Sequence, residues 1–263
     1  MPAKTKTPGA TKAAKAAAPR MTLAGAMAAL EVAGSEQTRK TYVRHGAPEP
    51  MFGVSFATLK TLMKRIGVDH ELGLALWDTG NFDARNLAVK VVDPARMSTA
   101  ELDRWAQAPY ARMCVAYVAH VVVEGPHARA KADQWLGAPA EAQRFVAWTL
   151  VGAMAMRDET TPDAWFADRL AEIERSIHTA PNAEREGMNH AVIAIGCRSA
   201  VLRKAAMAAV RRIGKVEVDH GDTACKTPDA GESIEKAWSH ATAKGFASPA
   251  AQDRKRESMR TRC

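Results

Sequence analysis

Four residues with reactive side chains fall within seven positions of one turn-rich segment. Residues 216–230 read VEVDHGDTACKTPDA and contain Asp219, His220, Asp222 and Cys225. Imidazole, carboxylate and thiolate groups all bind divalent metal ions, so a metal site is one interpretation, although the spacing matches no standard zinc pattern. A second is a Cys225 thiolate nucleophile, activated by His220 and Lys226. A third is structural, with aspartate and threonine side chains capping backbone amides, and we expect this one, with no cofactor.

Positively charged residues gather in a second stretch, which could contact the phosphates of a nucleic acid. No acidic residue occurs between Glu186 and Glu217. This interval holds Arg198, Arg203, Lys204, Arg211, Arg212 and Lys215. Duplex binding demands such neutralisation of the phosphate backbone, whereas a solvated helix face is the more usual role of a charge run. Further candidates for nucleic-acid contact are Arg44, Lys64, Arg65 and Arg144, with Trp148 beside the last of them.

The elements that position these residues are predicted to be short amphipathic helices. Apolar residues recur with helical periodicity and predict helices over 22–33, 36–45, 55–66, 69–78, 81–92, 98–107, 110–124, 127–136, 140–156, 162–177, 182–195 and 199–213. Ser98 and Glu101 fit a capping box, and Thr161 before Pro162 predicts another helix start. No alternating strand pattern precedes residue 215. We therefore predict an all-α solenoid of stacked helical hairpins, with a concave inner face.

One break between two of these helices has a distinctive sequence. Residues 41–67 read TYVRHGAPEPMFGVSFATLKTLMKRIG. Prolines lack an amide proton and restrict the preceding residue, so no helix passes through Pro48 and Pro50. The segment therefore predicts a rigid elbow that brings Tyr42 close to the basic helix end at Lys64 and Arg65.

The net charge of +8 belongs to the two ends of the chain. Residues 1–20 carry five basic residues and no acidic one, and residues 253–263 carry five basic and two acidic residues. We expect disordered basic tails over 1–20 and 247–263, a solenoid over 21–215, and a capping loop with a short helix over 216–246. Basic tails raise non-specific affinity for polyanions, so the body must supply any specific site.

Composition also limits where the protein works. No apolar run approaches the ~20 residues that cross a membrane, and residues 1–20 lack the hydrophobic centre of a secretory signal. The four cysteines are widely spaced and form no C-x-x-C pair, which indicates free thiols in a reducing compartment. We expect a cytoplasmic monomer, nucleoid-associated if the source is bacterial, that does not enter a membrane.

The elbow segment and a second stretch, ELGLALWDTGNFDARNLAVKVV at residues 71–92, resemble the AlkD-type family of DNA alkylation repair proteins. The resemblance extends over residues 21–215. It implies a HEAT-like solenoid, double-stranded DNA as partner, and excision of positively charged alkylpurines. By its place before the elbow, Tyr42 is similar to the family's DNA-facing tyrosine. Arg144, in EAQRFVAW, is similar to the arginine that approaches the lesion backbone.

The catalytic carboxylate of that family is missing where the resemblance places it. Losing a cationic base builds positive charge on the sugar, which a nearby carboxylate stabilises. The family has an aspartate four residues after a tryptophan, and in PYARMCVAYVAHVVV these places hold Val115 and Ala111. Tyr110 is the one aromatic residue at this helix start, and residues 104–123 contain no Asp or Glu.

We therefore expect a protein that binds damaged or unusual duplex DNA on a concave basic face, with glycosylase chemistry weak or absent. Three alternatives stay open. An active alkylpurine glycosylase would need a relocated carboxylate, such as Asp83 or Glu184. A protein–protein scaffold is the common use of solenoids. An enzyme that depends on a metal or on Cys225 would be centred on residues 216–230.

Overall fold

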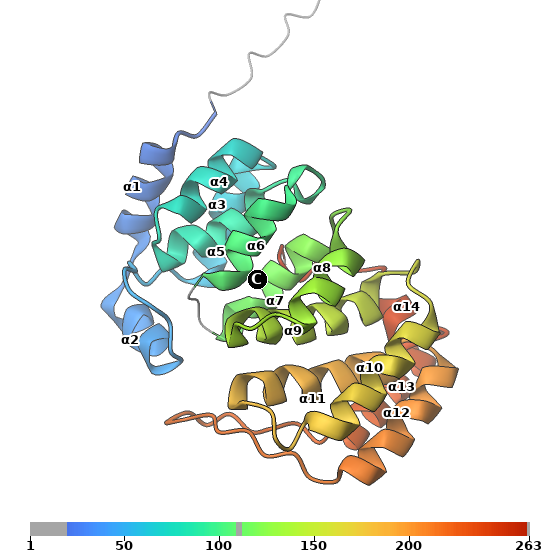
Figure 1. Ribbon diagram of the computed structural model, residues 1–263. Coiled ribbons are helices and arrows are strands. Elements are labelled where there is room, and N and C mark those ends of the chain that lie inside the picture. The colour runs from blue at the N-terminus through green and yellow to red at the C-terminus, as the bar shows by residue number, and fades with distance from the viewer. Residues whose placement is uncertain (1–19, 109–111, 262–263) are drawn as a thin grey trace, which may run out of the picture.

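The computed structural model describes residues 20–108 and 112–261, and the regular secondary structure of this part of the chain is helical (Figure 1). Its described residues form fourteen α-helices and one short 3-10 helix, η1 (Pro94–Arg96), and include no strand. The prediction of an all-α fold is confirmed. Among the described residues, no helix is long and apolar enough to span a membrane.

Short connections join most of the helices, and the two longer ones are the elbow between α2 and α3 and the loop between α12 and α13. The first seven are α1 (Leu23–Ala33), α2 (Glu36–Arg44), α3 (Phe56–Ile66), α4 (His70–Asp78), α5 (Phe82–Val91), α6 (Thr99–Gln107) and α7 (Arg112–Val123). The others are α8 (Ala128–Leu136), α9 (Glu141–Arg157), α10 (Asp163–Ser176), α11 (Asn182–Gly196), α12 (Ala200–Ile213), α13 (Ala230–Ala243) and α14 (Pro249–Asp253). All twelve helices predicted over 22–213 are present, with ends within one residue of the prediction. The predicted start of the helix over 110–124 lies outside the described residues.

The helices stack in two layers, as expected for HEAT-like hairpins. Helices α5, α7, α9 and α11 pack against one another in turn and form one layer, while α4, α8 and α12 cover it from the other side (Figure 1). A continuous apolar core runs between the layers. Trp77 of α4 and Trp105 of α6 stack at 4.0 Å between ring centroids, so consecutive repeats share one aromatic contact.

Two predicted helix starts turn out differently. The capping box is confirmed, because the Ser98 side chain accepts from the Glu101 amide while the Glu101 carboxylate accepts from the Ser98 amide. Thr161 is not a cap, since its hydroxyl donates to the Asp158 carboxylate and α10 begins at Asp163. The Asp158 side chain thus determines how the chain enters α10.

The elbow after α2 is held by one buried carboxylate. Asp83, at the start of α5, accepts hydrogen bonds from the backbone amides of Phe52, Gly53 and Val54 at 2.6, 3.0 and 2.8 Å. Gly53 has φ +80°, and a Cβ there would lie 2.5 Å from the Ser35 carbonyl oxygen, so only glycine fits. These contacts hold the elbow in one conformation against α5, and α2 ends before the prolines, as they predict.

The carboxyl end of the chain is not a loose tail. Residues 249–253 form α14, and the chain then runs back to the middle of the solenoid (Figure 1). The Arg260 side chain pairs with Glu124 at 2.6 Å and donates to the Val89 and Lys90 carbonyls. The Lys90 ammonium in turn donates to the Arg260 carbonyl at 2.7 Å.

The prediction of a disordered tail from residue 247 is therefore wrong for its described residues. Basic side chains of this segment satisfy buried carbonyls and carboxylates instead of extending into solvent. The prediction of a disordered tail over 1–20 concerns residues that lie outside the described ones, except for Arg20.

Candidate nucleic-acid interface

A cavity of about 540 Å3 opens where α2, α7, α9, α11 and the loop before α13 meet. We call it the Val115 cavity, after the residue at the expected aspartate position. Its lining comprises Arg44, His45, Gly46, Val115, Ala116, Phe145, Thr149, Glu186, His190, His220, Gly221, Thr223 and Cys225. Val115 itself is 1% exposed, so the wall at this point is apolar.

Three helices of one layer contribute residues from their amino-terminal halves to the cavity wall. Val115 belongs to α7, Phe145 to α9 and Glu186 to α11, and each lies within five residues of its helix start. A Cβ on Gly187 would lie 3.0 Å from the Trp148 Cβ and 3.3 Å from Phe145, so α11 approaches α9 closely here. The amino-terminal ends of helices carry partial positive charge, which favours anions on this side of the layer.

The loop between α12 and α13 forms the remaining wall. Asn182 of α11 holds it with two hydrogen bonds of 2.8 Å to the backbone of Asp219. Arg185 donates to the Glu217 carbonyl and Asn189 donates to the Pro228 carbonyl, each at 3.0 Å. The loop therefore lies along α11, on the side towards α2 (Figure 1). A second cavity, of about 890 Å3, separates its base from α11 and α12.

The four reactive side chains of this loop do not converge. The Asp219 carboxylate accepts from the Gly221 amide at 2.8 Å, and Asp222 and Cys225 are exposed. His220 faces inward, with Nε2 3.1 Å from the Thr227 hydroxyl and Nδ1 3.9 Å from a Glu186 carboxylate oxygen. Within residues 20–108 and 112–261, no group of three or more His, Cys, Asp or Glu side chains is arranged to hold a metal ion.

Two predicted DNA-contacting aromatic residues are inside the protein. Trp148 is 2% exposed within the core between the layers, so the expectation of a DNA-facing indole is wrong. Tyr42 is 5% exposed, and its hydroxyl donates to the Val54 carbonyl at 2.8 Å. Its ring packs on Phe56 and Phe82, which makes Tyr42 a support of the elbow. Tyr110 and Ala111 lie outside the described residues.

Arg144 is bound to the protein rather than pointing at solvent. Its guanidinium pairs with Glu184 at 2.7 Å and donates to the carbonyls of Ala138 and Pro139. The hydrogen bond with Glu184 raises the pKa of Arg144. The arginine thus joins the start of α9 to the start of α11, close to the Val115 cavity but not in its lining.

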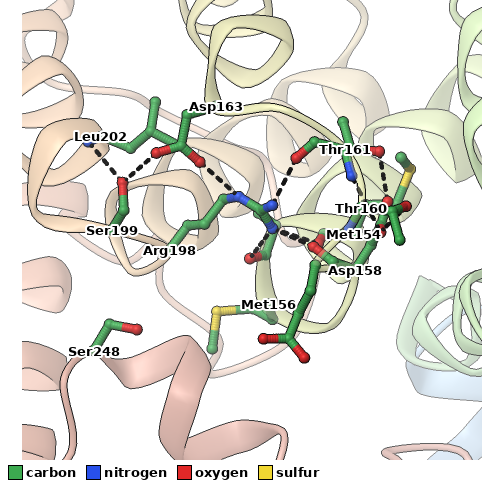
Figure 2. Close-up of polar contacts among 12 residues, drawn as sticks. Met154, Met156, Asp158, Thr160, Thr161, Asp163, Arg198, Ser199, Leu202 and Ser248 are labelled. Carbon is green, nitrogen blue, oxygen red and sulfur yellow. Dashed lines mark hydrogen bonds and ion pairs between the residues drawn. The ribbon is translucent and has the colours of Figure 1, made fainter.

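Arg198 occupies an internal polar cluster, which we call the Arg198 anchor (Figure 2). Its Nε donates to Asp163 at 2.9 Å, and its two terminal nitrogens donate to the carbonyls of Met154, Ala155, Asp158 and Thr161. Ser199 donates to the same Asp163 carboxylate at 2.6 Å. The Arg198 side chain is 9% exposed, so its predicted contact with DNA is wrong.

Most of the remaining basic run is neutralised by acids from elsewhere in the chain. Arg212 pairs with Glu174, Lys215 with Glu217, and Arg203 with Glu235 while lying over Trp238. Lys204, Arg211, Lys64 and Arg65 are exposed. In the described part of the chain, no ion pair joins Lys204 or Arg211 to a carboxylate. A run that is basic in sequence is thus mostly neutral in space.

Neither carboxylate proposed for relocated chemistry lines the Val115 cavity. Asp83 is fully buried under the elbow amides, and Glu184 is 5% exposed and paired with Arg144. The carboxylate that does line the cavity is Glu186, which the sequence analysis missed. Glu186 and His190 are four residues apart and share one helix face, and this spacing was the available signal.

Comparisons with known proteins agree with this architecture. The family described as DNA alkylation repair enzyme matches residues 26–234. The uncharacterized proteins Lmo0209 of Listeria monocytogenes and Lin0241 of Listeria innocua are each 26% identical over 215 residues, which cover 79% of this chain and 93% of theirs.

A solved structure shares most of the fold. It superposes with a TM-score of 0.76 at 29% identity, over 86% of this chain and 96% of the other. That protein is described as one of a new family related to the HEAT-like repeat DNA glycosylases, with affinity for branched DNA structures. The HEAT-like stack is therefore confirmed, and the present chain belongs to the DNA alkylation repair enzyme family.

Proposed function

We propose that this protein binds branched or damaged duplex DNA on the side of the solenoid that holds the Val115 cavity, without cleaving glycosidic bonds. The main support for DNA binding is the likeness to a protein with affinity for branched DNA structures, at 29% identity over 86% of this chain. The absence of chemistry rests on Val115, an apolar residue where the resemblance places the catalytic aspartate.

Charge near the cavity supports this orientation. Arg44 is exposed at the cavity rim, where it can meet a phosphate directly. The amino-terminal halves of α7, α9 and α11 add their partial positive charges on the same side. Lys64 and Arg65 are exposed in the last turn of α3, outside the cavity lining, whereas Phe56 at the start of α3 packs on Tyr42. The arginines at 144, 198, 203 and 212 each pair with a carboxylate of the chain.

The test compares a four-way DNA junction with a linear duplex of the same sequence, using the full chain and fluorescence anisotropy at several salt concentrations. We expect tighter binding to the junction, with an affinity that falls as salt rises. Arg44→Glu should weaken junction binding by about tenfold, through loss of one phosphate contact and repulsion. Lys204→Glu is the matched charge reversal on α12 and should change it less.

Two outcomes would redirect the proposal. A larger effect of Lys204→Glu would move the interface to the exposed side of α12. No salt-dependent binding of either DNA would favour the protein–protein scaffold.

Absence of glycosylase activity needs its own experiment. Excess protein is incubated with duplex DNA that carries 7-methylguanine, and free base is measured by chromatography beside a Val115→Asp variant. We expect no release by the wild type, because no carboxylate occupies position 115 to stabilise a cationic sugar. Release by the wild type would contradict the proposal and direct attention to Glu186.

A further inference from the structure

The loop between α12 and α13 encloses the larger of the two cavities described above, which we call the loop cavity. It lies between residues 214–230 and the helices α11 and α12, and its volume of about 890 Å3 falls among small-ligand pockets, which span roughly 300–1,000 Å3. Val192 of α11 and Val210 and Ile213 of α12 give it an apolar floor, and Val218 adds apolar surface from the loop. Such a floor suits a flat aromatic ring.

One buried amide lines this cavity and has an unused acceptor. Asn189 is 2% exposed, and its Nδ2 donates to the Pro228 carbonyl at 3.0 Å. A carbonyl can only accept, so this bond fixes which end of the amide faces the loop. No hydrogen bond from the described part of the chain reaches Oδ1, whereas buried polar atoms normally have a partner. A donor from a ligand would satisfy it.

We propose that the loop cavity binds an adenine nucleotide, with its base on the apolar floor against Asn189 and its phosphate at Lys226. Asparagine matches adenine because Oδ1 accepts from the N6 amino group while Nδ2 donates to the neighbouring ring nitrogen. Nδ2 carries two hydrogens and Pro228 takes one, so the second can donate to the base. Guanine and hypoxanthine have an oxygen at position 6, which would oppose Oδ1.

Lys226 is the cation placed to meet the phosphate. Its side chain is exposed on the loop and lines the cavity. It lies two residues from Pro228, which Asn189 holds, and two extended residues span about 7 Å. This separation is comparable with that between a purine ring and its 5′-phosphate. An ammonium at the cavity mouth can therefore pair with the phosphate while the base reaches Asn189.

The other charged groups of the lining already have partners within the chain. Arg185 donates to the Glu217 carbonyl and to carbonyls at the end of α10. The acidic side chains accept from other groups, namely Glu217 from Lys215, Asp219 from the Gly221 amide and Asp229 from the Glu232 amide. Within residues 20–108 and 112–261, no ion pair or hydrogen bond engages the Lys226 ammonium, so it is left for a ligand.

The first test is calorimetric titration of the full chain, without DNA, with adenosine 5′-monophosphate, inosine 5′-monophosphate and adenosine. We expect the adenine nucleotide to bind about tenfold tighter than the inosine nucleotide, the lower end of the discrimination from one bidentate pair. Adenosine should bind more weakly than its monophosphate, because it lacks the group that meets Lys226. Equal affinities for the two nucleotides, or no binding of either, would overturn the inference.

A charge reversal tests the place of the phosphate. Lys226→Glu should weaken binding of adenosine 5′-monophosphate by about tenfold and leave that of adenosine unchanged, since only the nucleotide carries the phosphate. Lys236→Glu is the matched control, an exposed lysine of α13 outside the cavity lining, and should change neither. Equal losses in both variants would mean attraction by overall charge and would overturn the inference.

A larger side chain tests the place of the base. Val210→Phe fills the floor and should abolish binding of both adenosine and its monophosphate. Val201→Phe, at a residue of α12 that is 73% exposed and outside the lining, should keep both. Binding that survives in a folded Val210→Phe would place the ligand elsewhere and overturn the inference, and Lys226→Glu decides if that variant does not fold.

The nucleotide site and the proposed function stand or fall separately. The titrations contain no DNA, so their failure would leave the DNA interface untouched. Failure of junction binding would likewise leave a nucleotide site that loses its ligand in Lys226→Glu and Val210→Phe.

Discussion

The Arg198 anchor and the Val115 cavity contain the same residue types and put them to opposite uses. In the anchor, one guanidinium with 9% of its side chain exposed satisfies Asp163 and four backbone carbonyls. In the cavity, Arg44 is exposed at the rim and Glu186 and His220 line open space. The difference teaches that a charged side chain indicates a binding site only when the fold leaves it at an open surface instead of enclosing it.

Thiols give the sharpest contrast between the two regions. Burial raises the pKa of Cys197, next to the anchor, to about 12, whereas Cys225 at the cavity is exposed. At pH 8 the Cys197 thiolate fraction is then on the order of 10⁻⁴, and only the thiolate reacts. We expect iodoacetamide to alkylate Cys225 at least about a thousandfold faster, measured by mass spectrometry of the peptides.

The same raised pKa makes stability depend on pH. The folded thiol holds its proton to a higher pH than the unfolded thiol, whose pKa is about 8.5. The contribution of Cys197 is therefore complete below pH ~8.5 and is lost as the pH rises towards the folded value. Above pH 9, the free energy of unfolding of Cys197→Ala should fall less steeply with pH than that of the wild type. Rapid alkylation of native Cys197 would show that the anchor opens.

Removing the anchor arginine should give the largest loss of stability. Arg198→Ala leaves the carbonyls at the α9–α10 turn without the guanidinium donor, while Asp163 keeps the hydrogen bond from the Ser199 hydroxyl. The Asp163 side chain is 40% exposed, so water can replace part of its loss. We expect a loss of about 3 kcal/mol in urea unfolding, because several carbonyls are left without a donor. Lys204→Ala, on the exposed part of α12, should stay within about 0.5 kcal/mol of the wild type.

Arg198→Ala and Lys204→Ala together test whether the Arg198 anchor stabilises the fold or serves the interface. If Arg198→Ala retains its stability but loses affinity for junction DNA, the arginine serves the interface, as its sequence position alone suggests. If both variants keep stability and affinity, the polar cluster in Figure 2 contributes little to the fold.

The returning carboxyl-terminal segment should come next. Arg260→Ala removes the pair with Glu124 and the hydrogen bonds to the carbonyls of Val89 and Lys90. We expect a loss of about 2 kcal/mol, because Glu124 is partly exposed and water can replace some of these contacts. Hydrogen exchange should quicken in α5 and α7 but not in α12. Unchanged exchange would mean that the segment adds no stability there.

The sequence was sufficient for elements defined by local signals. Apolar periodicity marks each helix, and prolines and glycines lie within a few residues of the helix ends that they determine. All twelve helices over 22–213 were therefore predictable. Contacts between distant residues were not. The partners of Arg198 and Arg212 lie 35 and 38 residues away, and Arg260 meets Lys90 across 170 residues. Local charge counting therefore overestimated the basic face and misassigned the carboxyl-terminal tail.

The candidate site was predictable only in outline. Residue 115, the loop with His220 and the early arginine Arg44 were each noticed separately, and the fold brings them to one cavity. The spacing of Glu186 and His190 puts both residues on one face of α11, but nothing in the sequence ties that face to the loop before α13. Glu184, two residues before Glu186 on the same helix, points to Arg144 instead. A shift of two residues turns a helical side chain to another face, so the distinction needs the structure.

The smallest predicted effect concerns Tyr42, a residue of the elbow that the resemblance places against DNA. Tyr42→Phe removes the hydrogen bond to the Val54 carbonyl and keeps the ring packing on Phe56 and Phe82. We expect a loss of about 1 kcal/mol in the free energy of unfolding and no change in junction affinity. The reverse pattern, with stability kept and affinity lost, would mean that Tyr42 leaves the core to contact DNA. The elbow would then be part of the DNA-binding surface, like the Val115 cavity, and not an internal support of the fold, like the Arg198 anchor.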